Sequence, residues 1–247
     1  MNIKSFLGLG ISSIATAFLT GCMGIGIGAD LTADENGVDT DVSAEIEFTT
    51  EGVVNLTSIN FEEIASSTSG SIRLAGQVDI EETVSLTLDT LPADADVVFV
   101  VDTTGSMLWA IEQVKDAVEA AMLSAPERHY GIVVYRDRGD VYIAKTSAEL
   151  GSDLQSTVDA ADKIEAGGGG DLPEHVALGL HTALEMSTFR ADKEKHIILI
   201  GDAPDHGYTD DPITLDSTLA SAVDKGVKIH TVAIACAVVC KKEIELL

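Results

Sequence analysis

Basic and aromatic residues are scarce in this chain. Only 15 Lys and Arg residues stand against 41 Asp and Glu residues, which gives a formal net charge of −26, and aromatic residues make up 4% of the sequence. A surface this acidic repels the phosphates of nucleic acids and the headgroups of anionic lipids. Nucleic acid is therefore not expected as a partner, whereas divalent cations and basic partners remain compatible with the composition.

Several enzyme signatures are also missing. The sequence contains no GxSxG, no HExxH and no CxxC motif, and the glycine run Gly167–Gly170 lacks the lysine of a phosphate-binding loop. These absences leave no support for the enzyme classes that such motifs mark, and they disfavour a nucleotide site.

The N-terminus predicts export. Lys4 precedes an apolar run, Phe6–Leu19, that is too short to span a bilayer comfortably, and the run leads into Leu19-Thr20-Gly21-Cys22. This ending resembles a bacterial lipobox, so residues 1–21 are expected to be a signal peptide and Cys22 to carry the lipid. Met23 after the cysteine favours the outer membrane or cell surface, with the membrane contacted only through the anchor. The alternative is an ordinary signal peptide with an incidental cysteine.

Two further cysteines, Cys236 and Cys240, lie near the C-terminus. In an oxidising compartment they could form a disulfide if the segment is a helix or a turn, but not if it is an extended strand. No third soft ligand lies nearby, which disfavours a metal site at this pair.

The first third of the chain differs in composition from the rest. Residues 30–96 contain 16 acids and a single base, Arg73, and are rich in Thr, Ser and Val. Residues 22–44 are interpreted as an acidic flexible tether. The segments 71–74 and 83–88 alternate polar and apolar residues as half-buried strands do, so residues 45–95 are predicted to form a small β-rich module.

From residue 96 onward strands and helices alternate. Strands are predicted at Val97–Val101, Tyr130–Tyr135, Val141–Lys145, His196–Ile200 and Val227–Ala235. Helical spacing or composition is seen near 107–122, 152–165, 174–189 and 213–225. Arg138-Gly139-Asp140 is interpreted as a hairpin turn. The fold class is therefore α/β: a doubly wound, mostly parallel sheet with one antiparallel edge strand.

Two acids follow predicted buried strands. Asp102 follows the strand at 97–101 and Asp202 follows the strand at 196–200, so both are expected at the edge of the sheet where ligands of such folds bind. Asp102, Thr104 and Ser106 also place three oxygen-bearing side chains at alternate positions of one glycine-containing turn. The simpler interpretation of each acid alone is a helix cap or a turn residue.

The segment Asp102-x-Thr104-x-Ser106 resembles the DxTxS signature of von Willebrand factor A (VWA) domains. The resemblance covers roughly residues 96–240, including the segments Tyr135-Arg136-Asp137, Gly167–Glu174 and Leu199–Asp202. It implies a VWA domain over residues 96–247 with a metal-ion-dependent adhesion site. It also implies a protein-binding role and not an enzymatic one.

The expected metal ligands are Asp102, Thr104, Ser106 and Asp202, and the expected cofactor is Mg²⁺, or else Mn²⁺ or Ca²⁺. An open coordination position would accept an Asp or Glu of a partner protein. Many relatives supply a further Thr from the second loop, where this chain has Asp171 as the apparent substitute. A third carboxylate would weaken the attraction for a partner carboxylate. The alternative for Asp171 is a cap on the helix that begins near Pro173.

Two other functions are weighed. Haloacid dehalogenase-type phosphatases also place an Asp and a Gly-Asp after parallel strands, but their first motif needs a second Asp where this chain has Thr104. A hydroxyl cannot serve as that general acid at ordinary pH. The remaining alternative is a structural scaffold in which the acids are caps.

Overall fold

The computed structural model describes residues 50–76, 78–170, 172–185 and 189–235, together with the backbone of four short strands between residues 25 and 48. Side chains are described from residue 56 onward within these ranges. Cys22, Asp171, Cys236 and Cys240 lie outside the described residues, as does the expected signal peptide.

A six-stranded sheet forms the centre of the molecule, in the order β5-β10-β9-β6-β7-β8. Its strands are β5 (Ile72–Ala75), β6 (Asp96–Asp102), β7 (His129–Tyr135), β8 (Ala144–Ala148), β9 (Lys195–Gly201) and β10 (Val227–Ile234). All neighbours pair in parallel except β8, which runs antiparallel to β7 at one edge. This arrangement confirms the predicted fold class.

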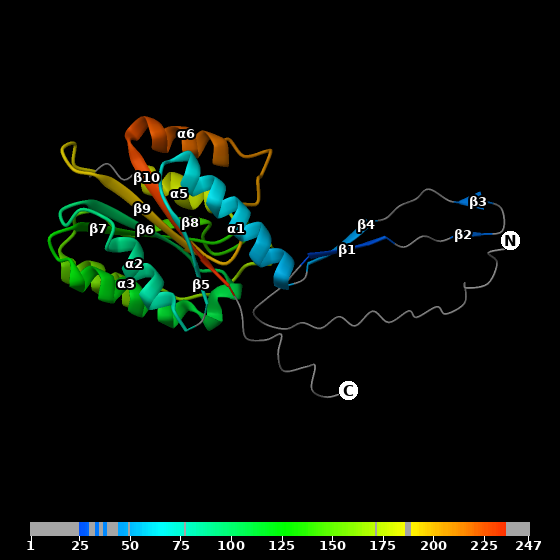
Figure 1. The fold of residues 1–247 in the computed structure, drawn as a ribbon, viewed down its shortest axis with the longest axis horizontal. Helices are drawn as coiled ribbons and strands as arrows, with labels where there is room; N and C mark the ends of the chain where they lie inside the picture. The colour runs from blue at the N-terminus through cyan, green and yellow to red at the C-terminus, as the bar shows by residue number, and fades with distance from the viewer. Residues whose placement is uncertain are drawn as a thin grey trace.

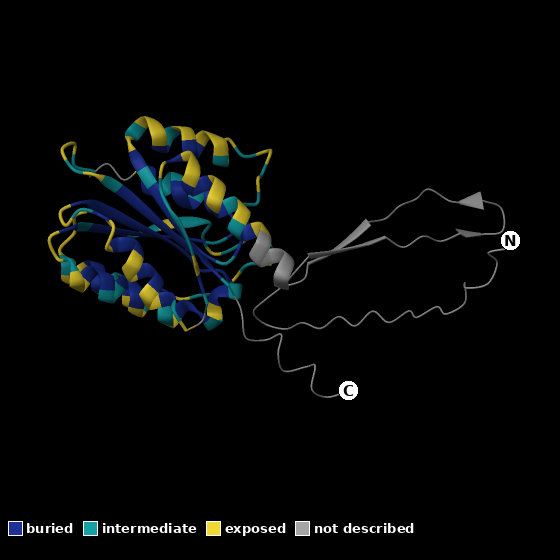
Figure 2. Cartoon of the chain, in the orientation of Figure 1, coloured by how far each residue is buried: buried dark blue, intermediate teal, exposed yellow. Residues whose placement is uncertain are grey.

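Helices cover both faces of the sheet (Figure 1). The helices α1 (Thr50–Ser67), α5 (Val176–Leu184) and α6 (Leu215–Lys225) lie on one face, and α2 (Ile80–Leu88), α3 (Ile111–Ser124) and α4 (Leu154–Asp162) lie on the other. Every residue of β6 is buried, as Figure 2 shows for the centre of the sheet. A run of β-branched residues suits a strand whose two faces are both covered.

Local sequence signals fix several helix ends. Thr214 accepts a hydrogen bond from the backbone of Ser217 and forms a capping box at the start of α6. The same helix stops before Gly226, whose φ of 67° is left-handed. Asp153 caps α4 by accepting from the Ser156 backbone.

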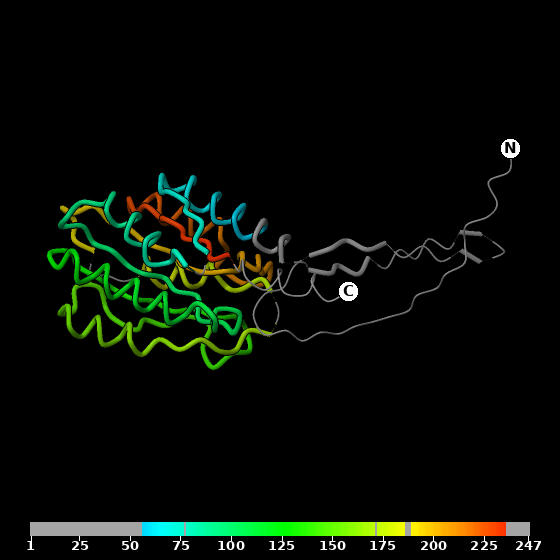
Figure 3. Tube along the Cα trace, turned by 60° about the horizontal axis from the view of Figure 1, so that its bottom comes forward, coloured from blue at the N-terminus to red at the C-terminus, as the bar shows by residue number. Residues whose placement is uncertain are grey.

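The prediction of a β-rich module at residues 45–95 is wrong in two respects. Residues 83–88, expected as a strand, belong to helix α2, whose buried residues Ile80, Thr83, Val84, Thr87 and Leu88 follow helical spacing. The predicted strand at 71–74 is present as β5, but it pairs with β10 in the central sheet. Figure 3 shows the trace of α1 running beside the C-terminal strand and α6, so this region completes the main domain.

Two further boundaries differ from expectation. The hairpin partner of β7 was expected at Val141–Lys145 but is Ala144–Ala148, because a longer turn follows Tyr135. In the expected tether, β2 (Ala33–Asp34) pairs antiparallel with β3 (Gly37–Val38), and β1 (Ile25–Ala29) pairs antiparallel with β4 (Ala44–Phe48), which extends beyond the tether's expected end at residue 44. No helix among the described residues has both the length and the apolar character to cross a membrane.

Candidate metal centre

The first loop of the site begins where β6 ends. Asp102 and Thr104 are fully buried, and Asp102 Oδ1 accepts hydrogen bonds from the Thr104 backbone N–H at 2.9 Å and from the Thr104 hydroxyl at 2.7 Å. The turn that these bonds close leads into a short 3₁₀ segment, Gly105–Trp109. The Asp102 carboxylate therefore stabilises the conformation of the loop that follows it.

The second predicted acid meets this loop. Asp202 directly follows β9, which lies beside β6 in the sheet. Ser106 Oγ donates to Asp202 Oδ1 at 2.8 Å, and Ser106 Oγ lies 3.1 Å from Thr104 Oγ1. The four side chains Asp102, Thr104, Ser106 and Asp202 therefore form one continuous hydrogen-bonded set, as the sequence predicted for their location.

Two glycines allow this close approach. A Cβ at Gly201 would lie 2.7 Å from the Tyr135 hydroxyl and 3.0 Å from Asp102 Cβ. A Cβ at Gly105 would lie 2.7 Å from the carbonyl oxygen of Gly168, to which Gly105 N–H donates at 2.9 Å. Any larger residue would push the three loops apart.

The glycine-rich loop contributes an acid that the sequence analysis missed. Glu174 is 1% exposed, and its Oε2 has no hydrogen-bond partner. Backbone bonds hold it against the Asp202 loop, because Glu174 N–H donates to Pro204 O and the His206 N–H donates to Glu174 O. A Cβ built on Gly169 would meet both Glu174 Oε1 and Thr104 Cβ at 3.1 Å, which places Glu174 beside the first loop.

The sequence offered one signal for this residue. The loop Gly-Asp-Leu-Pro-Glu contains two acids three positions apart, and pattern alone cannot tell which one faces inward. Asp171, the predicted ligand, lies outside the described residues, so its role stays a prediction.

The pKa values of three carboxyl groups in the site are raised above their ordinary values. Burial raises the pKa of Asp102 to about 6 and, with the nearby charge of Asp102, the pKa of Asp202 to about 7. The pKa of Glu174 rises to about 10, chiefly through burial and then through the charges of Asp102, Asp137 and Asp202. Close, buried carboxylates of like charge favour either protonation or a bound cation.

Neighbouring groups support the site without neutralising it. Tyr135 OH donates to Asp102 Oδ2 across 3.5 Å, and burial raises the pKa of this phenol well above its ordinary value, so it stays a donor. Asp137 is buried and accepts two hydrogen bonds from Tyr208 OH, at 2.9 and 2.7 Å. Asp140 Oδ2 accepts from Gly169 N–H at 2.9 Å and so anchors the glycine loop.

The donor set fits a hard divalent cation. The converging atoms are carboxylate and hydroxyl oxygens, which Mg²⁺, Mn²⁺ and Ca²⁺ prefer. Across the described ranges, no three His, Cys, Asp or Glu side chains come together as a metal site by themselves. The oxygen atoms that converge here include the hydroxyls of Thr104 and Ser106 as well as the acids.

The geometry does not favour the phosphatase alternative. The side chain at position 104 is a buried hydroxyl that donates to Asp102, so it occupies the general-acid position without an acidic proton to give.

The turn Arg138-Gly139-Asp140 lies between β7 and β8 as predicted. Arg138 pairs with Asp210 and Asp211 at 2.8 Å each.

This chain is similar to a protein of known sequence and to a solved structure. A protein named alpha-protein kinase vwkA, from Dictyostelium discoideum, is 30% identical over 159 residues, which cover 59% of this chain and 25% of that protein. The chain thus spans about a quarter of that relative's length. The crystal structure of the conserved hypothetical protein BatB from Bacteroides thetaiotaomicron aligns with a TM-score of 0.45 and 19% identity, covering 56% of this chain and 66% of the other.

The family comparison falls on the part of the chain that carries the site. The matched segment begins in β6, includes Asp102, Thr104, Ser106 and Glu174, and ends two residues after Asp202. Residues 97–204 of this chain match the family model of the von Willebrand factor type A domain.

Proposed function

We propose that this protein is a metal-dependent protein-binding module, displayed on the cell envelope through a lipid on Cys22. The proposal for the anchor rests on the sequence Leu19-Thr20-Gly21-Cys22 and on the apolar run before it. The proposal for binding rests on the oxygen cluster at the carboxyl edge of the sheet.

One observation carries the proposal. Ser106 Oγ donates to Asp202 Oδ1 at 2.8 Å, so two loops that are 96 residues apart in sequence bring their oxygen atoms to one point. A cation held there by Asp102, Thr104, Ser106 and Asp202 would supply a Lewis-acidic centre that an Asp or Glu of a partner protein can complete. The metal then joins two acidic surfaces that would otherwise repel, which suits a chain with a net charge of −26.

The third loop tunes the affinity for the partner. Glu174 or Asp171 adds a carboxylate near the same centre, and the added negative charge strengthens cation binding but weakens attraction for a partner carboxylate. We therefore propose a tightly held cation and a partner that contributes further contacts beside its carboxylate.

A pull-down from cell-envelope extract tests the proposal. The full protein is immobilised with Mg²⁺ or with chelator, beside an Asp102→Ala/Ser106→Ala variant and an exposed control, Glu127→Gln. We expect metal-dependent capture of a discrete partner that the double variant loses and the control keeps. Equal capture by every variant, with and without chelator, would refute the proposal.

A further inference from the structure

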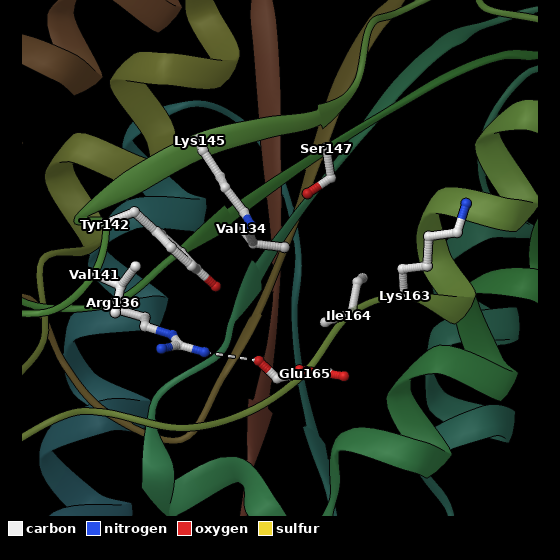
Figure 4. A pocket seen from close by; sticks show the side chains of 9 residues that line it. All are labelled: Val134, Arg136, Val141, Tyr142, Lys145, Ser147, Lys163, Ile164 and Glu165. Atoms are coloured by element: carbon white, nitrogen blue, oxygen red, sulfur yellow. Dashed lines mark hydrogen bonds between the residues drawn. The ribbon is translucent and has the colours of Figure 1, made fainter.

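A cavity lies between the β7–β8 hairpin and the end of α4, beside the loop that carries Asp102 and Thr104. It encloses about 200 Å³, and its walls include Arg136, Tyr142, Lys145, Lys163 and Ile164 (Figure 4). We call it the basic pocket. Three cationic side chains and one acidic residue, Glu165, line it, although acids outnumber bases by 41 to 15 in the whole chain.

The lysines of the basic pocket lack the partners that other bases have. Six other bases pair with acids: Lys115 with Glu112, Arg138 with Asp210 and Asp211, Arg190 with Asp96, Lys193 with Asp94, Lys225 with Glu185 and Lys228 with Glu194. Arg73, Arg128 and Lys195 donate to backbone carbonyl oxygens. Within the described ranges, the ammonium groups of Lys145 and Lys163 form neither an ion pair nor a hydrogen bond. In so acidic a chain, uncompensated cations gathered around one cavity point to an anionic ligand.

Arg136 is held in place with most of its donors unused. One terminal nitrogen donates to Glu165 O at 2.9 Å, while Nε has no hydrogen-bond partner. The guanidinium lies 4.7 Å from the centre of the Tyr142 ring, and Lys145 Nζ lies 4.3 Å from the same centre. Cation–π contacts orient both groups without consuming their charge.

Tyr142, which lines the basic pocket, contacts the loop that carries Asp102 and Thr104. Tyr142 OH lies 2.8 Å from Thr103 Oγ1, and Thr103 stands between Asp102 and Thr104. Thr103 also donates to Tyr135 O at 2.8 Å, which fixes the hydroxyl. The ring that orients the two cations is therefore itself fixed by the sheet.

We propose that the basic pocket binds a small oxyanion, a carboxylate or phosphate group, independently of any metal. Arg136 offers donors in the planar arrangement that matches such groups, and Lys145 and Lys163 add two ammonium charges to the lining. The oxyanion is carried either by a free small molecule or by an acidic side chain of a bound protein. This inference goes beyond the proposed function and does not depend on it.

Nuclear magnetic resonance on the ¹⁵N-labelled protein tests the inference. The protein is first freed of metal by chelator, and the chelator is then removed by dialysis. Glutarate, inorganic phosphate and a capped triglutamate peptide are titrated separately into this metal-free protein, with ionic strength held constant by NaCl. We expect saturable shifts at the Arg136 Nε–H and at the backbone amides of Lys145, Ile164 and Glu165. Because no metal is present in this titration, failure here and failure of the metal-dependent function are distinguishable.

Matched variants decide the outcome. Lys145→Ala/Lys163→Ala should weaken the affinity at least about tenfold, whereas Lys115→Ala/Lys193→Ala, which removes two lysines from ion pairs elsewhere, should not. Saturable binding of glutarate or phosphate identifies a small-molecule site, and binding of triglutamate alone identifies a site for a protein's acidic side chain. Absence of saturable shifts for all three probes up to about 20 mM, or equal affinity in both double variants, overturns the inference.

Discussion

Ser106 and Asp202, 96 residues apart in the chain, are joined by a hydrogen bond of 2.8 Å at the carboxyl edge of the central sheet. The bond unites the loop after β6 with the loop after β9, two strands that are neighbours in the sheet. The position of both residues follows from parallel topology, because the carboxyl ends of parallel strands meet at one edge.

Replacing Ser106 with Ala should weaken cation binding. The variant loses one oxygen and also removes the hydroxyl that donates to Asp202 Oδ1, so we expect at least about a tenfold loss of Mg²⁺ or Mn²⁺ affinity by calorimetry. Ser85→Ala, on the exposed side of α2, is the matched control and should bind as the wild type does. An unchanged affinity in Ser106→Ala would remove this hydroxyl from the site.

Gly105→Ala should destabilise the loop junction. The new methyl group would lie 2.7 Å from the Gly168 carbonyl oxygen, a backbone atom that cannot move aside cheaply. We expect a loss of about 1–3 kcal/mol in the free energy of unfolding, measured by urea denaturation in chelator.

Gly170→Ala is the control for that measurement. Nothing lies within 4 Å of a Cβ at Gly170, and its φ is not left-handed, so its unfolding free energy should change by less than about 0.5 kcal/mol. Equal effects of the two substitutions would show that the two loops are not in contact.

Glu174→Gln should separate cation binding from folding. Burial and neighbouring carboxylates raise the pKa of Glu174 to about 10, so the metal-free protein holds a neutral carboxyl that glutamine imitates. The melting temperature in chelator should stay close to that of the wild type, while the rise caused by Mg²⁺ should shrink.

Asp171→Asn gives the comparison on the same loop. If Glu174 is the acid that acts on the cation, Mg²⁺ should raise the melting temperature of Asp171→Asn more than it raises that of Glu174→Gln. The reverse order would return the role to Asp171, as the sequence pattern first indicated.

Stability at acidic pH should depend on a buried histidine pair. His196 Nδ1 lies 3.1 Å from His230 Nε2, and His230 Nδ1 accepts from Ser71 N–H at 3.2 Å, so His230 donates its Nε2 proton to His196. Burial lowers the pKa of both residues to about 4. Both are therefore neutral in the folded protein at pH 7.

The sign of the effect follows from these pKa values. An unfolded histidine titrates near pH 6.5, so between about pH 6.5 and pH 4 the unfolded chain binds more protons than the folded one. The contribution of the pair is complete above about pH 6.5 and is lost as the pH falls toward 4. The urea midpoint of the wild type should fall more steeply between pH 7 and pH 5 than that of His230→Asn; parallel slopes would contradict this assignment.

The central part of the fold was predictable because its signals are local and strong. Val97–Val101 is apolar at every position, as a strand covered on both faces requires, and Asp102 marks its end. The alternation at 83–88 misled the prediction, because Val84 and Leu88 also satisfy helical spacing, and packing of α2 against α3 decided between the two. Leu86, which alternation would bury, is 44% exposed.

The residues of the candidate metal centre were predictable to different degrees. Asp102, Thr104 and Ser106 belong to one short turn, so their proximity in space follows from their proximity in the sequence. Glu174 depends on how a glycine-rich loop folds back on Pro204 and His206, and a run of four glycines leaves that path undetermined from sequence. The basic pocket combines residues from β7, β8 and the end of α4, and no sequence motif marks such a set.

The most direct test of the account is a calorimetric titration of Mn²⁺ into the metal-free protein, comparing the wild type with Asp102→Asn. Asp102 is fully buried and contacts Thr104 on the motif loop, so its carboxylate should be central to any cation site there. We predict one cation per chain in the wild type and no measurable binding in Asp102→Asn, with circular dichroism showing both folded. Absence of binding in the wild type, or equal binding by both proteins, would contradict the assignment of a metal centre to this edge of the sheet.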